Sequence, residues 1–189
     1  MRSLILCSAL AALGASVYAA GPIPRPAQQL EIQDSAGKHT LSSYKGKVVV
    51  VQFLLTTCPH CQAFSQILTK LQNEYGSKGF QAIGAAVNEA TPQMAADYAK
   101  QYAPNFPVGP LNHDLVYSFM GFSVMERPGF PQIAVVDRKG QVREQTTTEM
   151  IAQPLQNEAH LRGLVEKLLA ERVTGSVAAP AATVATAKK

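Results

Sequence analysis

Two features are missing from this sequence, and each absence argues against a class of protein. The apolar stretch near the N-terminus, from Leu4 to about Leu13, is well short of the ~20 residues that a membrane-spanning helix needs. Lysine and arginine form no cluster that could bind phosphates. The net charge of +4 falls to +1 when one arginine and two lysines at the chain ends, Arg2, Lys188 and Lys189, are set aside. We therefore expect neither a retained membrane anchor nor binding to nucleic acid.

The N-terminal segment instead has the layout of a secretory signal peptide. The basic residue Arg2 precedes the apolar stretch, and small residues at Val17 and Ala19 fit cleavage after Ala19. We expect residues 1–19 to be removed and the mature chain to be periplasmic or otherwise exported, where disulfides persist.

The rest of the chain is expected to form one domain. Apolar residues make up 47% of the sequence and charged residues 16%, which suits a single globular domain with a sizeable core. The expected segments are an extended, proline-rich lead-in at 20–29, the domain at 30–172 and a disordered, Ala-rich tail at 173–189.

Cysteine is scarce, with three among 189 residues. Cys7 is expected to leave with the signal peptide, so the mature chain keeps Cys58 and Cys61. A scaffold held together by disulfides would need more cysteines, spread along the chain. The two remaining cysteines can pair only with each other or with a partner.

Hydrophobic patterning predicts alternating strands and helices. Residues 47–55 are nearly all apolar and rich in valine, which is typical of a strand buried on both faces of a central sheet. Apolar residues then recur every three or four positions up to Gly76, which predicts a helix from Cys58 to Tyr75. The other expected elements are a hairpin turning at 34–37, a strand at 79–88, a helix from 91 to about 102, at most a short edge strand within 103–110, one or two helical turns at 113–119, a hairpin turning at 137–140 and a final helix at 157–172. This order predicts an α/β domain with a mixed central sheet flanked by helices.

The two cysteines lie in Cys58-Pro59-His60-Cys61, where the central strand gives way to the helix. The free backbone N–H groups and the positive dipole end of the first helical turn stabilise a thiolate at Cys58. Pro59 suits the first helical position, and Cys61 follows one turn later, near enough to close a disulfide. His60 is expected to favour the thiolate further, which makes the disulfide a stronger oxidant. This placement predicts Cys58 as the attacking sulfur and Cys61 as the resolving one.

The segment KGKVVVVQFLLTTCPHCQAF, with a β-hairpin and YKGK upstream and FPQIAVVDRKG downstream, resembles the thioredoxin-like proteins of the TlpA/ResA and redoxin group. The resemblance runs from about Leu30 to Leu169. It implies a thioredoxin fold that carries an N-terminal β-hairpin.

The same resemblance implies a substrate-binding element. In this superfamily the proline just before the strand that faces the active site is cis, and the backbone beside it pairs with the bound substrate. The resemblance therefore implies a cis bond between Phe130 and Pro131, packed against Cys58, with Thr57 also contacting substrate. Pro128 is the other candidate for this proline.

Two positions depart from the family pattern. These proteins usually carry a tryptophan immediately before the first cysteine, but this chain has Thr57 there and no tryptophan at all. They also often place a buried acid six residues before that cysteine, where it would take the proton of the resolving thiol. Here that residue is Gln52, so we expect another group, Glu126 or a water, to take the proton, or exchange to be slower.

The resemblance implies an exported thiol-disulfide oxidoreductase that exchanges disulfides with protein substrates and needs no cofactor. We expect a monomer acting as a reductase, fed by a membrane thiol transporter and serving clients such as apocytochrome c. The Pro-His dipeptide argues for the opposite direction, because it resembles that of the strongly oxidising periplasmic enzyme of the superfamily. That oxidase has an inserted helical domain, and no comparable insertion is evident between Asn88 and Pro131.

Two alternatives keep the fold but change the activity. A peroxiredoxin would need a proline and a threonine upstream of its reactive cysteine, where this chain has Val51 and Leu55, so peroxidase activity is not expected. A binding protein without turnover is consistent with the departures at Gln52 and Thr57.

A periplasmic copper chaperone is a third alternative. Cys58 and Cys61 would supply two soft ligands, and His60, His113 or Met125 would complete the site. Related copper proteins of this fold separate their cysteines by three residues, which differs from the spacing here. Without a metal, the expected places are the surface for His39, His113 and His160 and the core for Met120 and Met125.

Overall fold

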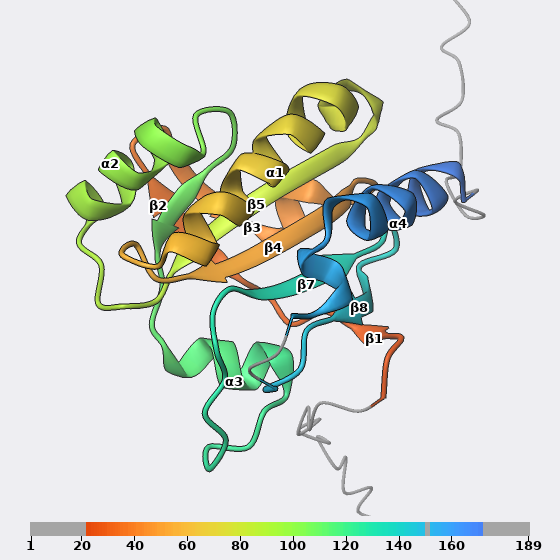
Figure 1. Ribbon diagram of the computed structural model, residues 1–189. Helices are drawn as coiled ribbons and strands as arrows, with labels where there is room; N and C mark the ends of the chain where they lie inside the picture. The colour runs from red at the N-terminus through yellow and green to blue at the C-terminus, as the bar shows by residue number, and fades with distance from the viewer. Residues whose placement is uncertain (1–21, 150–151, 172–189) are drawn as a thin grey trace, which may run out of the picture.

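The computed structural model describes residues 22–149 and 152–171, and its elements follow the predicted order (Figure 1). The strands are β1 (Arg25–Pro26), β2 (Glu31–Asp34), β3 (Gly37–Thr40), β4 (Val48–Leu54), β5 (Phe80–Ala86), β6 (Val108–Pro110), β7 (Gln132–Val136) and β8 (Gln141–Gln145). The helices are α1 (Pro59–Tyr75), α2 (Pro92–Tyr102), α3 (Asp114–Met120) and α4 (Glu158–Ala170), with 3-10 turns η1 (Leu41–Tyr44), η2 (Gly76–Lys78) and η3 (Pro154–Gln156). No helix within these ranges is long and apolar enough to cross a membrane. The expected signal peptide and tail lie outside the described residues.

Strand β4 lies inside a six-stranded mixed sheet with the order β1-β8-β7-β4-β5-β6. It pairs parallel with β5 and antiparallel with β7. Every residue of β4 and β5 is buried. Since successive side chains of a strand point to opposite faces of the sheet, the unbroken apolar run of β4 fills two cores.

Helices lie on both faces of the sheet (Figure 1). Apolar residues of α1, α2 and α4 form one core with the sheet. Those of α3 and the β2–β3 hairpin form a second core against the other face. The hairpin packs against β6 so closely that a Cβ on Gly109 would lie 2.5 Å from the carbonyl oxygen of Gln33. The predicted fold class, a mixed sheet flanked by helices with an N-terminal hairpin, is confirmed.

Helix α1 begins at the motif, with Cys58 as its N-cap and Pro59 in the first turn. It ends at Tyr75, as the periodicity predicts. Gly76 keeps a helical conformation with φ −55°, however, and the chain turns away only at Gly79, with φ 99°. A residue with a side chain is strained at that positive φ, so Gly79 rather than Gly76 redirects the chain into β5.

The proline-rich lead-in contributes a strand that the sequence did not predict. Arg25 and Pro26 form β1 and pair antiparallel with β8. The buried guanidinium of Arg25 donates to the carbonyl oxygen of Phe119 and to Oε1 of Gln145, both at 2.7 Å. The lead-in is thereby tied to the last turn of α3, where carbonyl groups lack partners within the helix.

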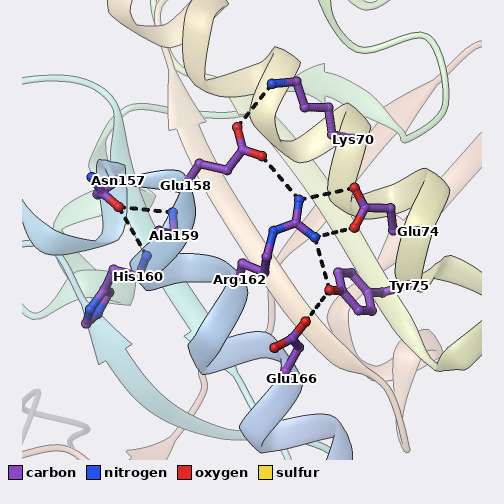
Figure 2. Close-up of polar contacts among 9 residues, drawn as sticks. All are labelled: Lys70, Glu74, Tyr75, Asn157, Glu158, Ala159, His160, Arg162 and Glu166. Carbon is purple, nitrogen blue, oxygen red and sulfur yellow. Dashed lines mark hydrogen bonds and ion pairs between the residues drawn. The ribbon is translucent and has the colours of Figure 1, made fainter.

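A polar network joins the C-terminal half of α1 to α4 (Figure 2). Arg162 of α4 donates to the Glu74 carboxylate, to the Tyr75 hydroxyl at 3.0 Å and to Glu158 at 3.1 Å. Lys70 of α1 reaches the other oxygen of Glu158 at 3.1 Å. This network stabilises the packing of α1, the helix that begins at the two cysteines, against α4.

Candidate active site

Cys58 and Cys61 are free thiols that lie one helical turn apart. The backbone N–H of Cys61 donates to Sγ of Cys58 at 3.4 Å. Sγ of Cys58 in turn donates to the carbonyl oxygen of Phe130 at 3.7 Å. The Cys58 sulfur is therefore held between the start of α1 and the loop before β7.

The two thiols differ in their access to solvent. Cys58 is partly exposed, whereas Cys61 is 0% exposed and belongs to the core under α1. Burial, together with a hydrogen bond that the Cys61 thiol donates to the neighbouring Cys58, raises the pKa of Cys61 well above its ordinary value. Cys61 therefore stays a neutral thiol under conditions where an exposed cysteine begins to ionise.

The peptide bond between Phe130 and Pro131 is cis, as the resemblance implied. The other cis bond among the described residues joins Ile23 to Pro24. Pro128 is therefore not the cis proline. Phe130 packs beside both cores and its carbonyl oxygen contacts Cys58, so the expected packing of this loop against the cysteine is confirmed.

Asn88 holds the segment between β4 and the motif, a role that sequence reasoning missed. Its Oδ1 accepts from the backbone N–H of Thr56 at 3.2 Å, and its Nδ2 donates to Oγ1 of Thr56 at 3.0 Å. Because Asn88 follows β5, which pairs with β4, the two strand ends are tied together directly beside Thr57 and Cys58. A polar residue at the end of a buried strand was the available signal.

Gln52 is fully buried in β4 and is hydrogen bonded through both ends of its amide. Its Nε2 donates to the carbonyl oxygen of Cys61 at 2.9 Å, and its Oε1 accepts from Oγ of Ser65 at 2.8 Å. Ser65 also lies 2.8 Å from the hydroxyl of Tyr98 on α2. The sequence singled out Gln52 as a departure, but it did not identify Ser65 or Tyr98 as its neighbours.

The remaining motif residues face solvent, and one of them, His60, lies at a hollow in the surface. Thr57, Pro59 and His60 are exposed. A hollow of about 280 Å³ next to His60 is lined by Phe130, Pro131 and Gln132 on one side and by Gln153 and Gln156 on the other. The structure thus brings His60, Phe130 and Pro131 together at one surface.

Residues considered for a metal site or for proton transfer lie in different surroundings. Within residues 22–149 and 152–171, no three His, Cys, Asp or Glu side chains gather where they could hold a metal ion. The His113 ring lies 6.1 Å from that of Phe130, centroid to centroid. Glu126 instead accepts from the backbone N–H of Ser123 in its own turn and from the hydroxyl of Thr148 in the segment after β8, so its carboxylate already has partners.

Two expectations for single side chains were wrong and three were right. Met125 was expected in the core without a metal, but it is 84% exposed at the tip of the turn from Ser123 to Glu126. His39 was expected at the surface, but it is half-buried because its two ring nitrogens bind Tyr44 at 2.8 Å and Asp34 at 3.0 Å. Met120 is buried in the second core, and His113 and His160 are exposed, as expected.

Comparison with known proteins gives a consistent picture. The sequence matches the Redoxin family over residues 22–162. It is 27% identical over 173 residues to the thiol-disulfide oxidoreductase ResA of Geobacillus thermodenitrificans, covering 87% of this chain and 94% of the relative. The ResA of Geobacillus kaustophilus is 26% identical with the same coverage.

A solved structure shares the fold. The thiol:disulfide interchange protein of the thioredoxin family from Chlorobium tepidum superposes with a TM-score of 0.64 and 26% identity. The superposition covers 79% of this chain and 99% of that protein. The architecture is therefore that of a thioredoxin-like protein.

Proposed function

Because the chain belongs to the Redoxin family and is a thiol-disulfide oxidoreductase, we propose that Cys58 and Cys61 form its redox-active pair. The observation that carries this assignment is the contrast between the partly exposed Cys58 sulfur, 3.4 Å from the N–H of Cys61, and the fully buried Cys61 thiol. Only Cys58 is open to a protein partner. Cys61 is placed to attack whatever becomes bonded to Cys58.

The proposed reaction proceeds through a mixed disulfide. The Cys58 thiolate attacks one sulfur of a client disulfide, and the other client sulfur leaves as a thiolate. Cys61 then attacks Cys58, forms the intramolecular disulfide and releases the second client thiol. The first turn of α1 stabilises the anionic form of Cys58 through its free N–H groups and dipole, and exposed His60 lies beside it.

The client is proposed to lie across Thr57 and the Phe130–Pro131 loop. Thr57 is exposed next to Cys58, and Phe130 and Pro131 line the hollow beside His60. Polar backbone groups on both sides of the Cys58 sulfur would hold an extended segment of a client with its disulfide in line. Pro59, in the first helical turn, sets the direction in which the sulfur faces that segment.

Reduction of client disulfides is the proposed direction, with the protein exported and resupplied by a membrane thiol transporter. The likeness to ResA proteins supports this direction, and the chain between Asn88 and Pro131 holds only α2, β6 and α3, without an inserted helical domain. Maturation of a c-type cytochrome is the proposed use, and the protein is proposed to act as a monomer.

Substitution of each cysteine tests the assignment. Cys58→Ser should abolish reduction of insulin disulfides, since no attacking thiolate remains. Cys61→Ser should stop turnover but trap mixed disulfides, visible as slower bands on a non-reducing gel. Full activity in the Cys58→Ser protein would refute the proposed pair, and mixed disulfides trapped by Cys58→Ser rather than Cys61→Ser would reverse the two roles.

A further inference from the structure

Behind Cys61 a buried chain of hydrogen bonds runs through three elements, α2, α1 and β4. The chain links Tyr98, Ser65, Gln52 and the carbonyl oxygen of Cys61 at 2.8, 2.8 and 2.9 Å. All four residues are nearly or completely inaccessible, with Tyr98 the most exposed at 3%. Buried polar groups that are all satisfied in this way rigidify the packing around them.

The direction of every bond in this chain follows from the chemistry of its members. A carbonyl oxygen can only accept, so the Gln52 amide must turn its Nε2 toward Cys61 and its Oε1 toward Ser65. Ser65 must then donate its single proton to Gln52, which leaves its oxygen to accept from Tyr98. Burial raises the pKa of Tyr98, so its hydroxyl stays protonated and remains a donor. Tyr98 therefore donates to Ser65, Ser65 donates to Gln52, and Gln52 donates to the carbonyl oxygen of Cys61.

The chain ends on a residue that is held from both sides. The N–H of Cys61 donates to the Cys58 sulfur at 3.4 Å, while its C=O accepts from Gln52. Because Gln52 lies on β4, an interior strand that is paired with β5 on one side and β7 on the other, this arrangement fixes the first turn of α1 against the sheet. The side chains of Tyr98, Ser65 and Gln52 carry no charge, so these hydrogen bonds position Cys61 and supply no base.

We infer that Tyr98 and Ser65, acting through Gln52, are positioning residues that hold Cys61 for its attack on the Cys58 mixed disulfide. This inference rests on the proposed roles of the two cysteines. In the step concerned, the bond between the Cys61 and Cys58 sulfurs forms and the bond between Cys58 and the client sulfur breaks. The electron pair leaves with the client sulfur, and the proton lost by Cys61 ends on that released thiolate. The Cys58–Cys61 pair is oxidised and the client reduced.

The test separates the two chemical steps in one experiment. Reduced protein is mixed with one equivalent of dithiobis(nitrobenzoate), and release of the coloured thiolate is followed by stopped flow. The first release reports attack by Cys58, and the second reports resolution by Cys61. Tyr98→Phe removes only the hydroxyl group that donates at the start of the hydrogen-bond chain. The rate of the second release should therefore fall about fivefold, which corresponds to the loss of one buried hydrogen bond, while the rate of the first release is unchanged.

Tyr102→Phe is the matched control. Tyr102 lies on the same helix with its ring centroid 5.1 Å from that of Tyr98, and its hydroxyl has no hydrogen-bond partner among the described residues. Both releases should keep their wild-type rates in this variant. An unchanged second release in Tyr98→Phe, or an equal slowing of both releases, would overturn the positioning role.

Gln52→Glu distinguishes a positioning chain from a missing base. A neutral Glu at position 52 can still donate to the Cys61 carbonyl and accept from Ser65, but an ionised one can only accept and would repel that carbonyl. The second release should therefore fall as pH rises and the new carboxyl ionises. If the rate of the second release rises with pH instead, the missing function at position 52 is that of a base and not that of a positioning group, and the inference is wrong. Release of one thiolate by wild-type protein, or of two by Cys58→Ser, would refute the proposed cysteine pair itself.

Discussion

The thiols of Cys58 and Cys61 lie one helical turn apart, yet they have different surroundings. Cys58 is partly exposed and its sulfur contacts two backbone groups, the N–H of Cys61 and the carbonyl oxygen of Phe130. Cys61 is fully buried in the core of α1. The neutral form of Cys61 is favoured by this burial, and the difference between the two thiols has consequences for stability as well as for reactivity.

The stability of the reduced protein should fall at alkaline pH because of Cys61. Burial raises the pKa of Cys61 in the folded protein, while the unfolded thiol ionises near its ordinary pKa of about 8.5. Above that pH the unfolded state binds fewer protons than the folded state, so the free energy of unfolding decreases as pH rises. The slope contributed by this one thiol approaches about 1.4 kcal/mol per pH unit. Urea unfolding of reduced protein at neutral and alkaline pH measures it.

Cys61→Ala is the control for this pH effect. It removes the thiol, so its loss of stability between neutral and alkaline pH should be smaller than that of the reduced wild type. An equal loss in both proteins would show that other groups cause the alkaline effect and that Cys61 ionises as readily in the folded protein as in the unfolded one.

Asn88 should matter for exchange although it lies outside the motif. Asn88→Ala removes both hydrogen bonds to Thr56 and frees the segment that carries Thr57 and Cys58. Each lost bond should cost about 1 kcal/mol of stability, and insulin reduction should slow because the Cys58 sulfur is held less firmly. Asn88→Asp keeps an acceptor for the Thr56 N–H, so it should lose less stability and less insulin-reducing activity than Asn88→Ala. If the two variants behave alike, the hydrogen bonds to Thr56 do not position the cysteine.

Arg162 should contribute to thermal stability without affecting disulfide exchange. Arg162→Leu removes the contacts that join α4 to Glu74 and Tyr75 of α1, and the contact with Glu158 within α4 (Figure 2), so Tm should fall at low salt. Added salt should narrow the difference from wild type, because the partners are solvent-accessible and screened. Lys167→Ala, on the same helix, is the control, since Lys167 forms no ion pair within the described part of the chain. A Tm equal to that of wild type at low salt would show that the network contributes nothing measurable.

Local patterns were sufficient to predict most of the fold. The valine-rich run became β4 because a strand buried on both faces needs apolar side chains on both, and the cap residues Cys58 and Thr91 begin α1 and α2 as expected. β1 was not predicted, because its two residues, Arg25 and Pro26, carry no strand signal and pair only through β8. That pairing depends on a contact between chain segments more than 100 residues apart.

The site was predictable where its residues are adjacent in sequence and not where they meet only in space. Cys58 and Cys61 are fixed by their spacing at a strand-to-helix junction, and the Phe130–Pro131 bond followed from the family resemblance. Ser65 and Tyr98 gave no such signal, since a serine one turn after Cys61 and a tyrosine on α2 look like ordinary helix residues. Only the packing of α1 and α2 over β4 shows that both reach Gln52.

The reduction potential of the Cys58–Cys61 pair should identify the direction of exchange. A reductase should equilibrate with strongly reducing buffers and show a potential near about −270 mV or lower, whereas a thiol oxidant lies near about −120 mV. His60→Ala should lower the potential, because loss of a group that stabilises the Cys58 thiolate makes the reduced form less favourable. A shift of about 30 mV would correspond to about 1.4 kcal/mol. His160→Ala, which removes a histidine of α4 that is paired with Glu144 of β8, should leave the potential unchanged. A wild-type value near that of the oxidant would reverse the proposed direction while leaving the cysteine pair in place, and failure to form any intramolecular disulfide would refute the pair.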